Sequence, residues 1–164
     1  MSAIEIDITF QSPLWPQRLD SIIRDTITQT LALSPLSFKE AEISVVLADN
    51  DFIQTLNKNY RGQDKPTNVL SFPQMEPDEL EDTQDEFVSL GDVILAYETV
   101  EIEVSQQNKS FDEHVMHLLV HGTLHLLGYD HIENHEAEEM EALEIEILKQ
   151  IGVKNPYEFD KVVS

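Results

Sequence analysis

The stretch from His121 to His131, HGTLHLLGYDH, constrains the fold more than any other part of the chain. His121 and His125 are four residues apart, so on a helix they lie on one face, about one turn from each other. Gly128 follows and can adopt the left-handed conformation that ends a helix. The chain can then fold back, so that His131 can bind the same metal ion as His121 and His125. Three neutral imidazoles with one open position are typical of a catalytic zinc site, so we predict one Zn²⁺ per chain.

The composition agrees with one domain in a reducing compartment. A chain of 164 residues is most simply a single domain, here 1–164, and can bury a core without disulfides. The absence of cysteine fits the cytoplasm and removes the thiolates that most structural zinc sites use. Neither a signal peptide nor an apolar run near the ~20 residues of a membrane span is visible. We therefore expect a cytoplasmic protein with no membrane partner.

The charge is strongly acidic, with a net value of −22 from 32 acidic and 10 basic residues. Taken alone, this argues against nucleic acid as a partner, because phosphate binding relies on Lys and Arg, and no DNA partner is expected. The distribution is uneven, however, since Lys58, Arg61 and Lys65 lie within eight residues. They are either ordinary surface charges or a phosphate-contacting patch on an otherwise acidic body.

The periodicity of apolar residues predicts alternating strands and helices. The predicted strands cover residues 4–10, 43–47, 68–72 and 88–96, the last broken by Gly91. The predicted helices cover residues 16–33, 97–107, 111–127 and 133–151. A further short helix, capped by Asp49 or Asn50 and closed by Gly62, is predicted to carry Phe52, Ile53, Leu56 and Tyr60. This order predicts an α+β fold, a single layer of helices on a small mixed sheet, with a zincin-like metal site on a helix and the turn that follows.

The ligand spacing also occurs in metzincin proteases, as His-Glu-x-x-His-x-x-Gly-x-x-His, where the Glu is the general base. Here that position is Gly122, which cannot take a proton from zinc-bound water. A glycine does leave room beside the metal for a bulkier substrate or a close helix contact. The sequence therefore favours another hydrolysis, with a zinc peptidase as the alternative.

The other histidines have less specific interpretations. His114 and His117 share the helix face of the ligands, where packing, a hydrogen bond behind a ligand and solvent exposure all remain open. His135 is either a surface residue or a spare ligand. A metal closed by Asp130, Glu133 or His135 would be structural, and the chain would then be a non-catalytic ribosome-associated factor.

Residues 121–131 resemble the His-Gly-x-Leu-His-Leu-x-Gly-Tyr-Asp-His signature of the YbeY family, at every fixed position. These are bacterial metal-dependent endoribonucleases that act as rRNA maturation factors. Residues 59–73 and 90–94 resemble two further blocks, and the likeness runs from about residue 43 to residue 152. Asn68 stands where the family usually has Asp. Asn can replace that residue as a cap or a hydrogen-bond acceptor, but not as a charge near the metal.

The resemblance implies that His121, His125 and His131 bind zinc and that Arg61 is the functional arginine of the cleft. It implies cleavage of single-stranded RNA, maturation of the 3′ end of small-subunit rRNA, and ribosome quality control.

The chemistry of the neighbouring residues adds roles. Arg61 could neutralise charge on the transition state, with Lys58 and Lys65 positioning the strand. Asp130 either orients an imidazole and accepts a proton or stabilises a turn. The acidic loop 76–86 is either a solvated loop or a segment that binds ribosomal proteins on the ribosome.

Overall fold

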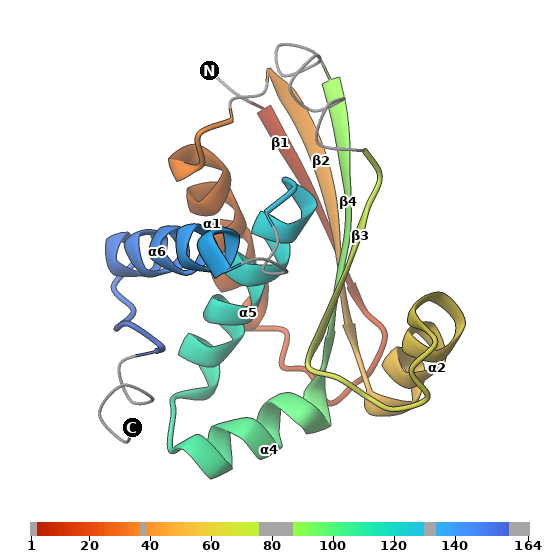
Figure 1. The fold of residues 1–164 in the computed structure, drawn as a ribbon. Coiled ribbons are helices and arrows are strands. Elements are labelled where there is room, and N and C mark those ends of the chain that lie inside the picture. Colours follow the sequence, from red (N-terminus) through yellow and green to blue (C-terminus); the bar gives the residue numbers. More distant parts are fainter. Residues whose placement is uncertain (1–2, 37–38, 76–86, 130–133, 158–164) are drawn as a thin grey trace.

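The computed structural model describes residues 3–36, 39–75, 87–129 and 134–157 (Figure 1). In chain order the elements are β1 (Ala3–Phe10), α1 (Leu19–Leu33), β2 (Glu40–Ala48), α2 (Asn50–Arg61), β3 (Val69–Pro73), β4 (Phe87–Ala96), α4 (Tyr97–Gln107), α5 (Phe111–Leu126) and α6 (Asn134–Gln150). This order confirms the predicted one. The predicted loop at residues 76–86 lies outside the described residues.

The four strands form one mixed sheet in the order β1-β2-β4-β3. β1, β2 and β4 run parallel to one another, and β3 pairs antiparallel at the edge beside β4. In β2, buried side chains alternate with more exposed ones through most of the strand, as the predicted period of two requires. β4 is buried at seven of its ten positions, as expected of a strand covered on both faces.

The predicted break of the last strand at Gly91 is wrong, because β4 continues through it. The register shifts there between Glu42 and Ile43 of β2, which marks a bulge. Gly91 has φ +125°, and a Cβ atom at this position would run into the carbonyl of Phe72 on β3. The glycine therefore allows a close approach of the edge strand rather than ending the strand.

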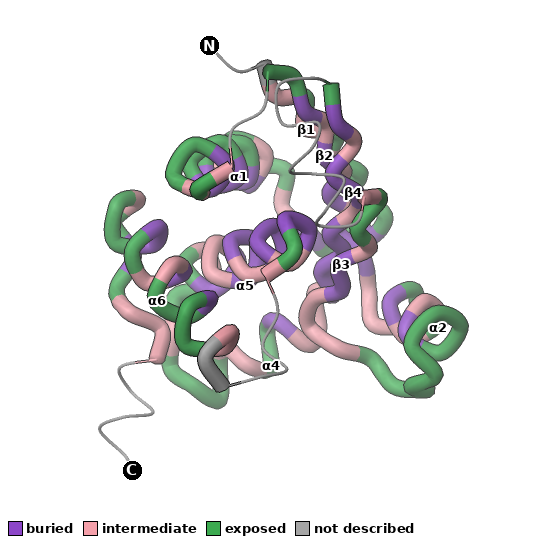
Figure 2. Tube along the Cα trace, turned by 45° about the horizontal axis from the view of Figure 1, so that its top comes forward, coloured by how far each residue is buried: buried purple, intermediate pink, exposed green. Residues whose placement is uncertain are grey.

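Most helices form one layer. In Figure 1, α1, α5 and α6 cover one face of the sheet, α4 crosses one end of it, and α2 lies on the opposite side. α5 lies at the centre, since it contacts β3, β4, α1, α4 and α6. Figure 2 shows this helix buried along much of its length. Within the described residues, no helix is long and apolar enough to cross a membrane.

α2 carries Arg61 to the edge strand. Asp49 caps its first turn, since the Asp49 carboxylate accepts a hydrogen bond of 2.8 Å from the backbone N–H of Phe52. Gly62 ends it in the left-handed conformation, with φ 70°. Both predicted ends are therefore confirmed. α1, in contrast, begins at Leu19 rather than at residue 16, where a turn precedes the helix.

Candidate metal centre

α5 ends as the position of Gly128 predicts. Gly128 has φ 98°, and its N–H donates to the carbonyl of His125 at 3.1 Å. The N–H of Tyr129 donates to the carbonyl of Leu124, also at 3.1 Å. These two bonds form a Schellman motif, which satisfies carbonyls that the end of a helix leaves over.

His121 and His125 face each other near the end of α5, and both residues are half-buried. Their Nε2 atoms lie 3.0 Å apart. His121 Nδ1 lies 2.7 Å from the Glu144 carboxylate of α6, and His125 Nδ1 lies 2.9 Å from the carbonyl oxygen of Tyr129. Both rings are thus held from behind by an oxygen atom.

These oxygens determine which nitrogen of each ring carries a proton. A carboxylate and a carbonyl only accept hydrogen bonds, so Nδ1 of each histidine must carry a proton. In neutral imidazoles, both Nε2 atoms then present lone pairs to each other. Lone pairs at this distance repel unless a cation or a proton lies between them. Two nitrogens on one tetrahedral zinc ion lie roughly 3.3 Å apart, given Zn–N bonds near 2.0–2.1 Å. The spacing of the pair is thus close to the one that two imidazoles bound to a single zinc ion require.

The structure does not describe the remaining predicted ligands. His131 and Asp130 fall outside the described residues, as do Glu133 and the side chain of His135. Within the described part of the chain, no group of three or more His, Cys, Asp or Glu side chains is arranged to hold a metal ion. The structure thus brings together two of the three predicted histidines.

Glu144 organises the helix face from α6, and sequence reasoning missed it. Its side chain is only 1 % exposed. One carboxylate oxygen accepts from His121, and the other accepts from His117 at 3.0 Å and from the Tyr157 hydroxyl at 2.6 Å. Burial alone would raise the pKa of Glu144, but these hydrogen bonds outweigh burial and lower the pKa to about 2. The carboxylate is therefore ionised and acts as an acceptor.

A sequence signal for Glu144 did exist. It lies four residues after Met140 and three before Ile147, on the apolar stripe of α6, and all three residues are buried. An acidic residue on the buried face of an otherwise regular amphipathic helix requires partners in the core.

His114 and His117 bind carboxylates through the opposite ring nitrogen. His114 Nε2 lies 2.9 Å from Glu103 of α4, and His117 Nε2 is bonded to Glu144. Nδ1 of each ring is buried without a hydrogen-bond partner among the described residues. Burial lowers the pKa of His117 more than Glu144 raises it, which favours the neutral ring. Of the three readings left open for this pair, solvent exposure is wrong, because both rings are largely buried. Only His117 shares its carboxylate with a candidate ligand, since Glu144 also bonds His121.

Asn68 completes the Glu103 cluster. Its amide Nδ2 lies 3.1 and 3.2 Å from the two carboxylate oxygens of Glu103. Burial raises the pKa of Glu103, but the bonds from His114 and Asn68 outweigh it and leave the pKa below its ordinary value. Asn68 therefore acts as a donor, a role that an ionised Asp could not fill here.

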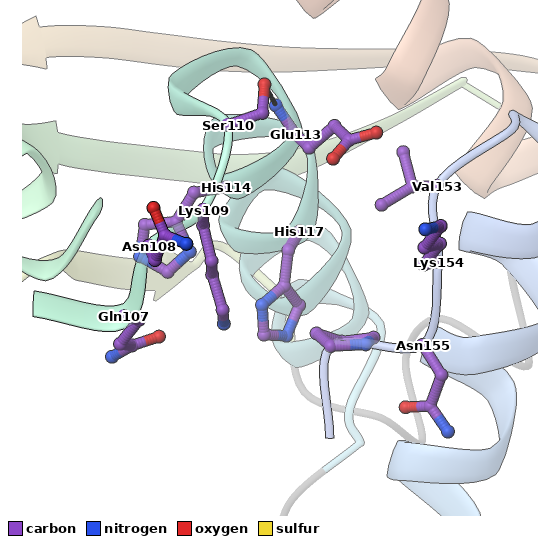
Figure 3. A pocket seen from close by; sticks show the side chains of 11 residues that line it. Gln107, Asn108, Lys109, Ser110, Glu113, His114, His117, Val153, Lys154 and Asn155 are labelled. Carbon is purple, nitrogen blue, oxygen red and sulfur yellow. Dashed lines mark hydrogen bonds between the residues drawn. The ribbon is translucent and has the colours of Figure 1, made fainter. Parts of the chain in front are cut away.

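A hollow of about 320 Å³ adjoins these two histidines (Figure 3). Its wall combines the start of α5 with the segment after α6, and it includes Lys109, His114, His117 and Lys154. His121 and His125 do not line it. The hollow is therefore separate from the candidate metal pair.

Arg61 lies beside β3. Its guanidinium donates to the backbone carbonyl of Ser71 at 2.6 Å, and its Cζ lies 5.4 Å from the centre of the Phe72 ring. The Ser71 hydroxyl in turn donates to the carbonyl of Gly122 at 2.9 Å. Two hydrogen bonds thus connect Arg61 to the residue that follows His121.

Gly122 makes the close helix contact that its sequence allows. A Cβ atom at this position would lie 2.9 Å from Val93 Cγ1 and 3.1 Å from Ser71 Oγ. Position 122 thus points at the sheet, where a side chain the size of Glu has no room. Of the two sequence readings of this glycine, the helix contact is the one observed.

The two lysines of the predicted patch lie near Arg61 in the chain and are exposed. Lys58 is 3.9 Å from Asp64, a weak pair in which both side chains are more than 60 % exposed. Lys65 makes no ion pair within the described residues, and its carbonyl accepts from Asn57 at 2.9 Å. This last bond fixes the backbone of the loop after α2.

Comparison with known proteins identifies the family. The family model described as endoribonuclease YbeY matches residues 7–152. The chain belongs to this family. An endoribonuclease YbeY of Sinorhizobium medicae is 42 % identical, with 96 % of each chain covered. One from a Bradyrhizobium species is 55 % identical over 72 % of this chain and 70 % of the relative. The solution structure of TM1509 from Thermotoga maritima superposes with a TM-score of 0.62 at 26 % identity, covering 89 % of this chain and 88 % of that one.

Family membership confirms the coarse predictions. The protein is an endoribonuclease, a hydrolase of phosphodiester bonds, in a metal-dependent family. The similar solved structure confirms the α+β fold with a mixed sheet. The alternative of a zinc peptidase is thereby set aside.

Proposed function

We propose that residues 1–164 act as one cytoplasmic domain that holds one zinc ion through His121, His125 and His131 and cleaves single-stranded RNA. We further propose that its substrate is rRNA, at the 3′ end of the small-subunit molecule, and that it serves ribosome quality control in contact with the ribosome or its proteins. The name of the relatives, endoribonuclease YbeY, supports an RNA substrate.

The geometry of His121 and His125 carries the metal part of the proposal. Their Nε2 atoms are 3.0 Å apart, and each ring is oriented through Nδ1 by an oxygen. Histidines that bind metals commonly donate their other N–H to a carboxylate or a backbone carbonyl, and both kinds of acceptor occur here. Zinc, when bound, would polarise a phosphoryl oxygen and activate water.

Arg61 supports the proposal that the site binds a phosphate group of RNA. Its bond to Ser71 uses one of five guanidinium N–H donors, so the others can bind a phosphate oxygen. Arginine keeps its charge at any working pH, and its planar fork matches a phosphate. We assign Arg61 the neutralisation of charge on the phosphorane-like transition state. Lys58 and Lys65 would hold the strand through phosphate contacts that carry no sequence information.

Asp130 is our candidate for the residue that orients an imidazole or accepts the proton of the attacking group. The proposal rests on its position next to His131 in the sequence. Carboxylates serve as general bases when they lie within hydrogen-bond reach of the proton they remove.

Arg61→Ala tests this function. It should keep one zinc per chain by elemental analysis and lower kcat on a single-stranded RNA oligonucleotide on the order of 100-fold, the loss seen when one preorganised donor to a transition state is removed. Lys149→Ala, an exposed lysine near the end of α6, is the control for lost charge. Unchanged kcat in the Arg61 variant would refute its role, and absence of stoichiometric metal in the wild type would refute the metal site.

The biological role needs a separate test. Cells depleted of the protein should accumulate small-subunit rRNA with an extended 3′ end, mapped by sequencing of RNA ends. Restoring wild-type protein should remove the extension, and restoring the Arg61→Ala variant should not. A normal 3′ end in depleted cells would argue against this substrate but not against RNA cleavage itself.

A further inference from the structure

Tyr60 is an exposed aromatic residue in the last turn of α2, directly before Arg61. It is 69 % exposed, although a large aromatic side chain gains most from burial. Its ring centre lies 5.5 Å from that of Phe72 on β3, with the planes at 69°, an edge-to-face arrangement. Arg61 lies over the same Phe72 ring. We call these three residues, Tyr60, Arg61 and Phe72, the aromatic platform.

Contacts with the sheet and with α5 hold the aromatic platform in place. Phe72 is partly buried and packs against the apolar cluster between α2 and the sheet, which contains Ile53, Leu70 and Ile94. Arg61 is fixed by its bond to the Ser71 carbonyl, and Ser71 is bonded to Gly122 on α5. The platform therefore has a defined position relative to the helix that carries His121. Exposure of Tyr60 is not a result of a loose loop, because it lies within a helix.

The charge around the platform is opposite to that of the whole molecule. Arg61 belongs to it, and Lys58 and Lys65 lie near it along the sequence, in a chain of net charge −22. Lys58 is partly offset by Asp64, while Lys65 makes no ion pair among the described residues. Exposed aromatic rings beside cations are the combination by which proteins bind single-stranded nucleic acid, with the rings stacking on bases and the cations contacting phosphates.

We propose that Tyr60 stacks on one unpaired nucleobase of the RNA substrate, with Phe72 holding the tyrosine ring from its edge and Arg61 binding a neighbouring phosphate. The inference rests on the proposed function and adds a base-binding site to it. It also gives a physical reason for single-strand preference, because bases inside a duplex have both faces covered by their neighbours. Since every base has a stacking face, the contact should tolerate any sequence.

The test is steady-state cleavage of a labelled single-stranded RNA oligonucleotide by wild type, Tyr60→Ala and Tyr60→Phe. Stacking in both ground and transition states predicts a higher KM with little change in kcat. We expect Tyr60→Ala to raise KM by about 5-fold to about 100-fold, the range for loss of one base–aromatic stack. Tyr60→Phe keeps the ring and should stay within about twofold of wild type. Phe87→Ala is the control, since Phe87 is an aromatic residue that is 55 % exposed at the far end of β4.

A substrate series separates stacking from a general loss of affinity. Oligonucleotides that each carry one abasic nucleotide should include one position that raises KM for wild type, and the same position should cost the Tyr60→Ala enzyme nothing further. Unchanged KM in Tyr60→Ala, or additive losses at every abasic position, would overturn the proposal. Thermal unfolding of each variant checks that the fold is intact.

A duplex arm distinguishes this inference from the proposed function. If wild type cleaves the annealed duplex as fast as the single strand, the proposed single-strand activity fails. The effect of Tyr60→Ala on KM for the single strand still decides whether Tyr60 stacks on a base.

Discussion

Two pairs of histidines occupy one face of α5, and they use opposite ring nitrogens. In the pair His121 and His125, Nδ1 is held by oxygen and the Nε2 atoms meet at 3.0 Å. In the pair His114 and His117, Nε2 is held by a carboxylate and Nδ1 is buried in the protein. Both pairs lie on one face of the same helix, three and four residues apart, so the surroundings create the difference.

The position of the oxygen acceptor therefore decides what a histidine on this helix can do. An acceptor behind the ring, at Nδ1, aims Nε2 at a shared point where a metal can bind. An acceptor at the tip of the ring, at Nε2, occupies the atom that would reach such a point. Glu144 does both, because one of its oxygens bonds His121 and the other bonds His117. One buried carboxylate thus connects a candidate ligand to a structural residue.

The largest contrast is expected between His121→Ala and His114→Ala. His121→Ala should lower both metal affinity and the rate of RNA cleavage by more than about 100-fold. Loss of a residue that only orients a ligand costs about 10- to 100-fold, and this variant removes a proposed ligand itself. His114→Ala should retain metal binding and cleavage but unfold at a lower temperature, since Glu103 loses a hydrogen-bond donor in a half-buried site. Metal content, cleavage rate and thermal unfolding of the two proteins provide the comparison.

Equal metal loss in both variants would erase the distinction between the pairs. Full metal content in His121→Ala would instead remove this residue from the ligand set.

Glu144→Gln should have the next largest effect. An amide cannot accept from His117, His121 and Tyr157 as an ionised carboxylate does, so the ring of His121 loses its fixed orientation. Loss of such an outer group typically lowers metal affinity 10- to 100-fold. Competition with a chelator measures this affinity, and Glu141→Gln, exposed on the same helix, is the matched control. Identical affinity in the two variants would show that Glu144 serves only the fold.

Features determined by local spacing could be predicted from the sequence. The helical period placed His121 and His125 on one face, and Gly128 gave the end of α5. The order of strands and helices followed from apolar periods of two and near four, because each element buries one face. These signals are confined to a few neighbouring residues.

Features that depend on distant partners could not be predicted. Glu144 lies 23 residues from His121, and Glu103 lies 35 residues from Asn68, so only the packed fold brings them together. Gly91 was misread because a glycine inside a strand resembles a break, while its role is to admit β3. The assignments of His131 and Asp130 rest on the sequence alone, since both lie outside the described residues.

Gly122→Ala tests whether the C-terminal half of α5, which carries His121 and His125, needs its close fit to the sheet. The new Cβ would press on Val93, a branched side chain with little freedom, and on the Ser71 hydroxyl. Overpacking of this kind costs about 1–3 kcal/mol in the free energy of unfolding, measured by urea denaturation. Combining it with Val93→Ala should cost less than the sum of the two single changes. Additive costs would mean that helix and sheet move apart freely at this point.

The smallest effect should be the pH dependence of the free energy of unfolding that comes from Glu103, which bonds His114 in the N-terminal half of α5. Bonds from His114 and Asn68 hold its pKa below the ordinary value of 4.5. Its contribution to stability is therefore fully present above about pH 4.5 and is lost as the pH falls through the lower pKa of the folded state. Glu103→Gln does not titrate, so wild type should exceed it in free energy of unfolding at neutral pH by under about 1 kcal/mol, given partial exposure, and the gap should shrink in acid. Urea denaturation at several pH values measures the gap, with the exposed Glu101→Gln as control for lost charge. A gap that does not shrink as the pH falls below 4.5 would mean that the Glu103 carboxylate does not stabilise the N-terminal half of α5 through its charge.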